Sequence, residues 1–70
     1  MGNIYLFLAE GFEEVEALSV VDIVRRAGLT IQTVSVTGHE TVTGAHGVPV
    51  KADMLFDATT IKREGVMLVL

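Results

Sequence analysis

The stretch NIYLFLAEGFEEVEALSVVDIVRRAG, residues 3–28, decides the fold that we expect for this chain. It begins with an apolar run at residues 3–9, which is typical of a β-strand buried on both faces. Residues 11–27 then show helical spacing, and Gly28 follows a last turn that contains two arginines, as at many helix C-termini. The stretch therefore predicts a strand that leads directly into a helix.

The rest of the chain continues with short β-prone segments. Residues 29–36 alternate between apolar and polar, which predicts a second strand. Residues 41–43 and 48–51 flank the sequence GAHG and predict a hairpin. Residues 53–63 form a mixed segment with at most one short helix, and residues 66–70 are again uniformly apolar. Apolar strands joined through a helix predict an α/β fold with a doubly wound, mostly parallel sheet.

The length of the chain is small for such a fold. With 70 residues it makes at most one small domain, which buries only roughly 60% of the surface that its unfolded chain exposes. One predicted helix cannot cover both faces of a sheet with three apolar strands. We therefore expect residues 1–70 to be the N-terminal segment of a single larger domain, completed by the remainder of that domain or by a second chain. The alternative is a complete miniature domain.

Composition and charge exclude several classes of function. Half of the residues are hydrophobic, which excludes disorder, and the net charge of −4 argues against a nucleic-acid partner. The apolar runs are shorter than the ~20 residues of a membrane-spanning helix, and no basic region typical of a signal peptide is present, so we expect a cytoplasmic protein. With no cysteine, these residues hold no thiol nucleophile, thiolate metal ligand or disulfide.

The junction between the first strand and the helix is unusually acidic. It carries the carboxylates of Glu10, Glu13, Glu14 and Glu16, which would repel a phosphate group. On a helical wheel Glu16 falls inside the apolar arc, between Ile23 and Ala27, whereas Glu14 does not, and Glu13 lies at the helix start where it can reach water or cap backbone N–H groups. We therefore expect Glu10, Glu13 and Glu14 to be solvated or capping groups.

Two interpretations of Glu16 remain open at this point. It is either a solvated first-turn glutamate that the helix dipole favours, or a partly buried carboxylate that shares a proton with a reacting group. In the second case it would lie beyond the carboxyl end of the first strand, where open α/β sheets bind their ligands.

The segments LAEGFEEVEAL, VVDIVRRAGL and TGAHGVPVKAD together resemble the N-terminal third of the ThiJ/PfpI superfamily, in the branch of the parkinsonism-associated protein deglycase. The resemblance covers essentially all 70 residues and implies a flavodoxin-like sheet. In such proteins the strand at residues 68–70 runs into a Pro-Gly-Gly turn that is missing here, and a cysteine follows on a strained elbow. The resemblance thus implies a chain that is truncated before the nucleophile elbow.

The resemblance also implies a catalytic role for Glu16, which matches a family glutamate that hydrogen-bonds the cysteine sulfur and stabilises the thiolate. The complete protein would be a glyoxalase, deglycase or amidase/peptidase-like enzyme that acts on a small carbonyl-type substrate. The alternative is a non-catalytic redox-sensing or chaperone-like member. The name thiazole monophosphate biosynthesis protein is also used in this superfamily, although no residue here recognises a thiazole.

His46 and Arg26 are candidate substrate-binding residues by the same resemblance. Relatives often place a basic or histidine side chain at the position of His46, where it reaches the pocket of the partner subunit, and an arginine near the subunit boundary at the position of Arg26. The alternative of a solvated loop histidine is preferred for His46, and an arginine in the last turn of a helix is expected from the helix dipole in any case. His39 is expected on a surface loop. Because neither histidine has a cysteine or carboxylate cluster near it in sequence, we expect no metal site, and nothing indicates a cofactor.

Val15 and Leu18 project near the polar side of the predicted helix and form a small exposed apolar patch. In relatives this helix packs on its twofold mate, so the resemblance implies a homodimer. Two scattered surface residues would need no such explanation.

Overall fold

The computed structural model describes residues 3–57 and 66–69. The elements in chain order are β1 (Ile4–Leu8), α1 (Glu14–Arg26), β2 (Ile31–Ser35), β3 (Thr41–Thr43), β4 (Pro49–Lys51), β5 (Met54–Leu55) and β6 (Val66–Val69). The predicted strand, helix, strand and hairpin are therefore confirmed. The short helix considered for residues 53–63 is wrong at residues 54–55, which form a strand, and residues 58–63 lie outside the described part of the chain.

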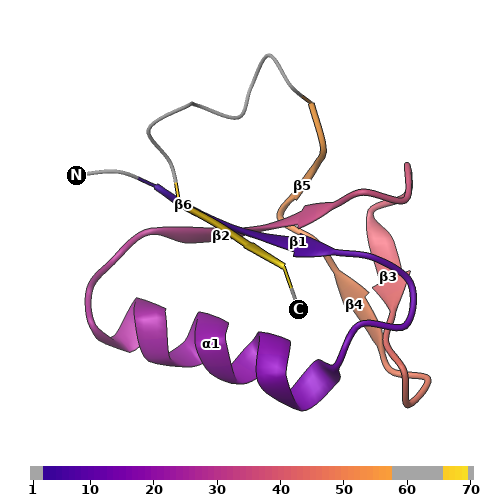
Figure 1. Ribbon diagram of the computed structural model, residues 1–70, viewed down its shortest axis with the longest axis horizontal. Coiled ribbons are helices and arrows are strands. Elements are labelled where there is room, and N and C mark those ends of the chain that lie inside the picture. Colours follow the sequence, from indigo (N-terminus) through magenta and orange to yellow (C-terminus); the bar gives the residue numbers. More distant parts are fainter. Residues whose placement is uncertain (1–2, 58–65, 70) are drawn as a thin grey trace.

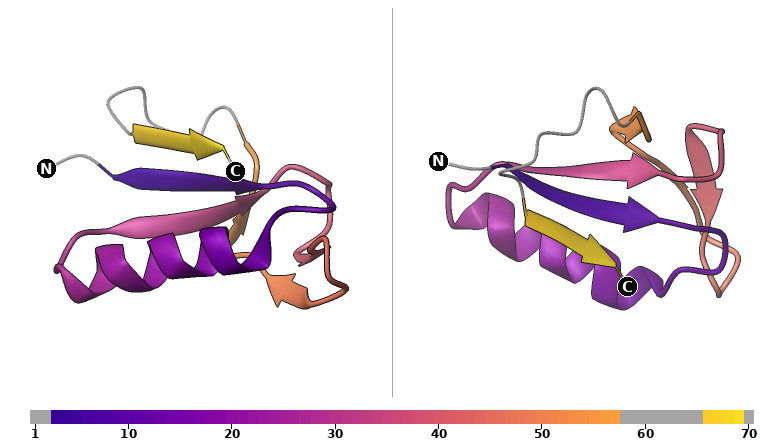
Figure 2. Two further views of the ribbon diagram at one scale, coloured as in Figure 1. Left: turned by 60° about the horizontal axis from the view of Figure 1, so that its bottom comes forward. Right: turned by 45° about the horizontal axis from the view of Figure 1, so that its top comes forward.

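The main sheet is parallel and has four strands in the order β5-β2-β1-β6. β1 pairs with β2 from Ile4 opposite Ile31 to Leu8 opposite Ser35, and with β6 on its other side. Helix α1 lies along one face of this sheet, and the antiparallel β3–β4 hairpin lies beyond the carboxyl ends of β1 and β2 (Figures 1 and 2). The predicted α/β fold class with a parallel sheet is confirmed.

The core lies between α1, the sheet and the hairpin. Its buried members are Leu6, Leu8, Phe12, Ala17, Ile31, Val42 and Ala52. Leu6 and Leu8 alternate with Phe7 along β1, so they share the face that α1 covers. Full burial of a leucine side chain contributes about 1.5–3 kcal/mol to the stability of the fold. Val42 extends the same core into the hairpin.

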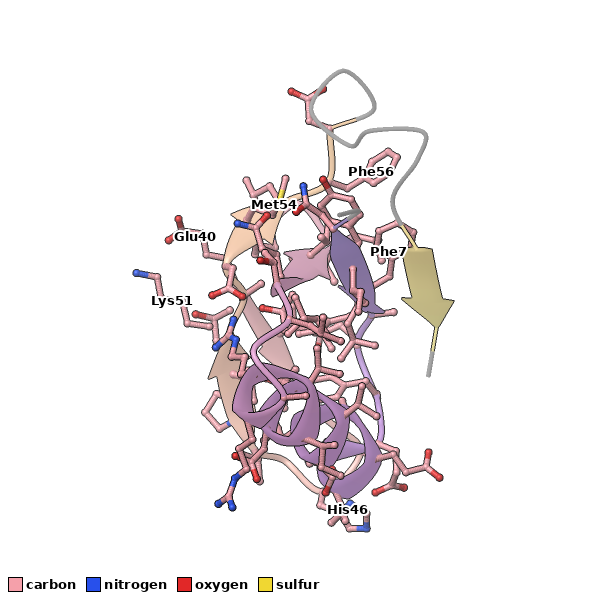
Figure 3. All side chains as sticks on the ribbon, turned by 90° about the vertical axis from the view of Figure 1, so that its left-hand side faces the viewer. Phe7, Glu40, His46, Lys51, Met54 and Phe56 are labelled. Atoms are coloured by element: carbon pink, nitrogen blue, oxygen red, sulfur yellow. The ribbon has the colours of Figure 1, made fainter. Side chains whose placement is uncertain are left out.

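Phe7 points to the opposite face of β1, where its ring meets that of Phe56 edge-on, with 5.9 Å between centroids (Figure 3). Within residues 3–57 and 66–69, no helix covers this second face. None of the helices in that part of the chain combines the length and the apolar character that a membrane crossing requires.

Local signals set the two ends of α1. The helix ends at Arg26, and Gly28 adopts φ +81° while its N–H donates to the Arg25 carbonyl, as the glycine stop predicts. At the other end Glu13 is the N-cap residue, but its side chain makes no capping hydrogen bond. The helix begins at Glu14, three residues later than predicted. A turn in which Gly11 adopts φ +85° precedes it.

Candidate functional site

The acidic junction and the GAHG loop lie against each other. After β1 the backbone N–H of Gly11 donates to the Thr43 carbonyl at 2.9 Å. The N–H of Ala45 donates to the Phe12 carbonyl at 2.8 Å. These two bonds hold the β3–β4 hairpin on the turn that precedes α1, so a loop about thirty residues downstream comes to surround the first residues of the helix.

Glu14 is the residue that this loop encloses. Its side chain is only 8% exposed. One carboxylate oxygen, Oε2, accepts hydrogen bonds from the backbone N–H groups of His46 at 2.8 Å and Val48 at 3.2 Å. The other oxygen, Oε1, lies 2.8 Å from Nδ1 of the His46 ring. Gly44 packs so closely on the Glu14 side chain that a methyl group at this position would overlap it. We call this arrangement the Glu14 clasp.

The clasp favours charge on both partners. Burial by itself raises the pKa of Glu14, but hydrogen bonds from the His46 ring and from backbone N–H groups outweigh it and lower the pKa from 4.5 to about 2. The hydrogen bond with Glu14 and the negative charges of Glu13 and Glu14 raise the pKa of His46 above 6.5, although burial opposes this shift. The clasp is therefore an ion pair in weakly acidic solution.

The structure corrects the expectation for Glu14, which is buried and not solvated. Glu16, for which two interpretations are open, is exposed within residues 3–57 and 66–69, and its catalytic role stays a prediction. The physical reason is that the packed side of α1 is centred on Ala17 and Val24, whereas Glu16 and Ile23 lie at the margin of the apolar arc. A wheel counts apolar residues but does not locate the sheet beneath them.

His46 is also placed differently from the expectation of an isolated histidine. Its side chain is 68% exposed, yet Nδ1 lies 2.8 Å from Glu14 and 3.5 Å from Glu13. Figure 3 shows the His46 side chain just below α1 in that view. The expectation that no carboxylate cluster lies near a histidine is therefore wrong for His46. Sequence spacing could not reveal this cluster, because 32 residues separate Glu14 from His46.

Arg26 lies at the other end of α1. It forms an exposed ion pair with Asp22 at 3.0 Å. Twelve residues of helix separate it from Glu14, a distance of about 18 Å. Within this chain the structure therefore does not bring Arg26 and His46 into one site, and their substrate-binding roles remain predictions.

A shallow groove of about 430 Å³ runs along the outer side of α1. It is lined by Glu14, Val15, Leu18, Ser19, Asp22 and Val48. The predicted exposure of Val15 and Leu18 is confirmed, and Val15 is 73% exposed. The clasp thus forms one end of an open apolar surface.

Comparisons with known proteins identify the family. The model of the DJ-1/PfpI family matches residues 2–70. A cysteine-to-alanine mutant of a DJ-1 superfamily protein from Salmonella typhimurium is 34% identical, with a TM-score of 0.75 over 79% of this chain and 30% of that chain. Oxidised DJ-1 from Toxoplasma gondii is 32% identical, with a TM-score of 0.83 over 99% of this chain and 38% of that chain.

These solved structures are much longer than the part that is matched, since the chain spans 30% and 38% of their lengths. Among curated proteins, none matches the chain significantly. The family match over nearly every residue agrees with the parallel α/β sheet and with the resemblance of the acidic junction. The chain therefore belongs to the DJ-1/PfpI family.

Proposed function

We propose that these residues form the N-terminal part of a DJ-1/PfpI domain whose reactive cysteine lies outside residues 1–70. The complete protein would be a cysteine-dependent enzyme of the glyoxalase, deglycase or amidase/peptidase-like type that acts on a small carbonyl compound. Two observations support a cysteine elsewhere. This chain has none, and it spans only 30% of a relative that was studied as a cysteine-to-alanine mutant.

The observation that carries this proposal is the free carboxylate of Glu16. Within residues 3–57 and 66–69 it forms no hydrogen bond or ion pair, whereas both oxygens of Glu14 are engaged in the clasp. Glu16 lies in the first turn of α1, next to the carboxyl end of β1, where open α/β sheets bind ligands. The carboxylate of Glu16 is therefore not occupied by another group in this part of the chain.

The exposed side chains near Glu16 are a second observation in favour of further chain that packs over this side of α1. Ile23 lies seven residues further along, on the same side of the helix, and is 66% exposed. An exposed isoleucine beside a free carboxylate suits a surface that further chain covers. There the Glu16 carboxyl group would donate a hydrogen bond to the cysteine sulfur and stabilise the thiolate, the form that attacks a carbonyl carbon.

A non-catalytic redox sensor or chaperone-like protein is the second candidate. It is favoured by the oxidised state in which the Toxoplasma gondii relative was solved. The same Glu16 hydrogen bond would then stabilise an oxidised sulfur such as a sulfinate. An elbow cysteine followed by a suitable histidine downstream favours the enzyme, and a cysteine without that histidine favours the sensor.

Roles for His46 and Arg26 in substrate binding require two subunits in this proposal. Because the two side chains lie at opposite ends of α1, each would reach the pocket of a partner subunit. The exposed Val15 and Leu18 supply an apolar surface for such a homodimer.

The test is the rate of thiol alkylation against pH in the complete protein. We expect Glu16→Gln to keep the fold, raise the apparent pKa of the reactive thiol and slow alkylation at neutral pH. Glu13→Gln is the matched control, since it makes the same substitution at the start of the same helix and should change neither quantity to a comparable degree. An alkylation profile for Glu16→Gln that coincides with that of the parent, or equal shifts in both variants, would reject a special role for Glu16.

A further inference from the structure

The Glu14 clasp and the neighbouring Glu13 bring together three potential metal ligands. Glu13 and Glu14 come from the start of α1, and His46 comes from the GAHG loop. One ligand atom of each lies within 4.8 Å of the others. Two carboxylate oxygens and a ring nitrogen therefore converge from two segments that the hairpin brings together.

The distances suit a first-row transition metal. Two protein ligands of a tetrahedral zinc ion, each about 2.1 Å from the metal, lie about 3.4 Å apart. Glu13 Oε1 and His46 Nδ1 are 3.5 Å apart. Glu14 Oε1 and His46 Nδ1 are 2.8 Å apart, so a small rotation of the exposed imidazole would open this pair to the required distance.

The buried ligand is held in place before any metal arrives. The backbone N–H groups of His46 and Val48 fix Oε2 of Glu14, whose side chain fills the space that a Cβ atom at Gly44 would occupy. Oε1 is consequently directed at the histidine. Ligating carboxylates in metal sites are usually oriented by such outer hydrogen bonds, which lower the cost of ordering the site.

The donor set points to the class of metal. An imidazole with two carboxylates suits zinc and neighbouring divalent ions, whereas magnesium and calcium prefer oxygen ligands alone. The side chains of Glu13 and His46 are 42% and 68% exposed, so water can complete the coordination. We propose that Glu13, Glu14 and His46 form a binding site for a divalent transition-metal ion of the zinc class.

This site is separate from the Glu16 flank. Glu13 and Glu14 carry the ligand oxygens, and Glu16 is not among them. Zinc binding and thiol tuning can therefore succeed or fail independently.

The experiment measures Zn²⁺ binding to the complete protein by titration calorimetry, after thiols have been blocked with iodoacetamide. We expect one zinc ion per chain and a loss of affinity of at least about tenfold in His46→Ala, since even outer-shell changes cost this much. His39→Ala is the matched control, because it removes the other histidine and should bind zinc like the parent. Co²⁺ should give visible absorption bands in the parent and in His39→Ala but not in His46→Ala.

The variant keeps its loop, because the two backbone bonds to Glu14 do not need the imidazole, and circular dichroism checks this. Glu13→Gln, at a half-exposed position, should also weaken zinc binding without unfolding. The proposal is overturned if the parent binds no zinc, if His46→Ala loses less than the expected affinity, or if His39→Ala loses as much.

Discussion

Glu14 and Glu16 are two residues apart on the same helix and have opposite environments. Residues i and i+2 project to different sides of an α-helix, so only one of them can face the hairpin. Glu14 is buried and accepts two backbone hydrogen bonds in addition to its contact with the His46 ring. A carboxylate is tolerated in this buried position because its oxygens are satisfied. Glu16, by contrast, is exposed.

The clasp predicts how stability depends on pH in chelator-treated protein. The pKa of Glu14 falls from 4.5 to about 2 on folding, so its contribution is complete above pH 4.5 and is lost as the pH falls towards 2. The pKa of His46 rises above 6.5, so its contribution is complete below pH 6.5 and is lost as the pH rises through the raised value.

The melting temperature of His46→Ala should therefore fall furthest below that of the parent between about pH 4.5 and 6.5. Thermal unfolding followed by circular dichroism from pH 2 to 9 measures this difference. A difference that is constant across this range would show that His46 contributes through packing and not through charge.

The sequence identified the right kinds of residue at this site but not their pairing. The four acids of the junction and His46 were each singled out, because acids at a strand-to-helix turn and a histidine between glycines are unusual. Glu14 and His46 are 32 residues apart in the sequence, and they meet because the hairpin packs against the start of α1. No helical or strand periodicity carries that information, so Glu14 was misplaced and its partner was missed.

At the scale of elements, α1 is attached to the rest of the fold at both ends. The Glu14 clasp fixes its start to the hairpin. Near its end, Arg25 donates to Oδ2 of Asp53 at 2.9 Å. The same oxygen accepts from the N–H of Thr33 at 2.9 Å and from its hydroxyl group at 3.1 Å. Asp53 thus joins α1 and β2 at the point where the chain enters β5.

Asp53→Ala should lower the free energy of unfolding by about 1–2 kcal/mol, because it removes several hydrogen bonds at a partly exposed position. Asp22→Ala is the matched control, since it breaks only the exposed pair with Arg26 and should cost about 0.3–0.5 kcal/mol. Urea unfolding of both variants measures the difference. Equal effects would mean that Asp53 acts only as a surface charge.

The major elements were predictable because their periodicities are strong. β1, α1, β2 and the hairpin lie within a few residues of their predicted bounds. β5 was missed because its two residues are too few to show alternation, and its position depends on parallel pairing with Val34 and Ser35. The late start of α1 follows a turn in which Gly11 adopts a positive φ, and a helical wheel does not show such a turn.

At the scale of the whole molecule, the exposed apolar side chains of α1 lie on two different sides. Val15 and Leu18 border the groove, and Ile23 lies on the flank that carries Glu16. On our account the first surface meets a second subunit, and the second surface meets further chain of the same domain. The two surfaces therefore predict different consequences for the same kind of substitution.

Val15→Asp should shift the complete protein from dimer towards monomer in sedimentation velocity while the subunit stays folded, because a buried charge opposes association. Ile23→Asp is matched in exposure, at 66% against 73%, and should lower the melting temperature without dissociating the dimer. An unchanged dimer in Val15→Asp would place the interface elsewhere.

The most direct test of the central claim is a crystal structure of the complete protein, read at the two glutamates. We predict that the Glu16 carboxylate lies within hydrogen-bond distance of a cysteine sulfur, in a segment that also covers Ile23. Glu14 should keep its bonds to the backbone N–H groups of His46 and Val48. A structure in which Glu16 remains in solvent, or in which Glu14 leaves the clasp to reach the sulfur, would contradict the account.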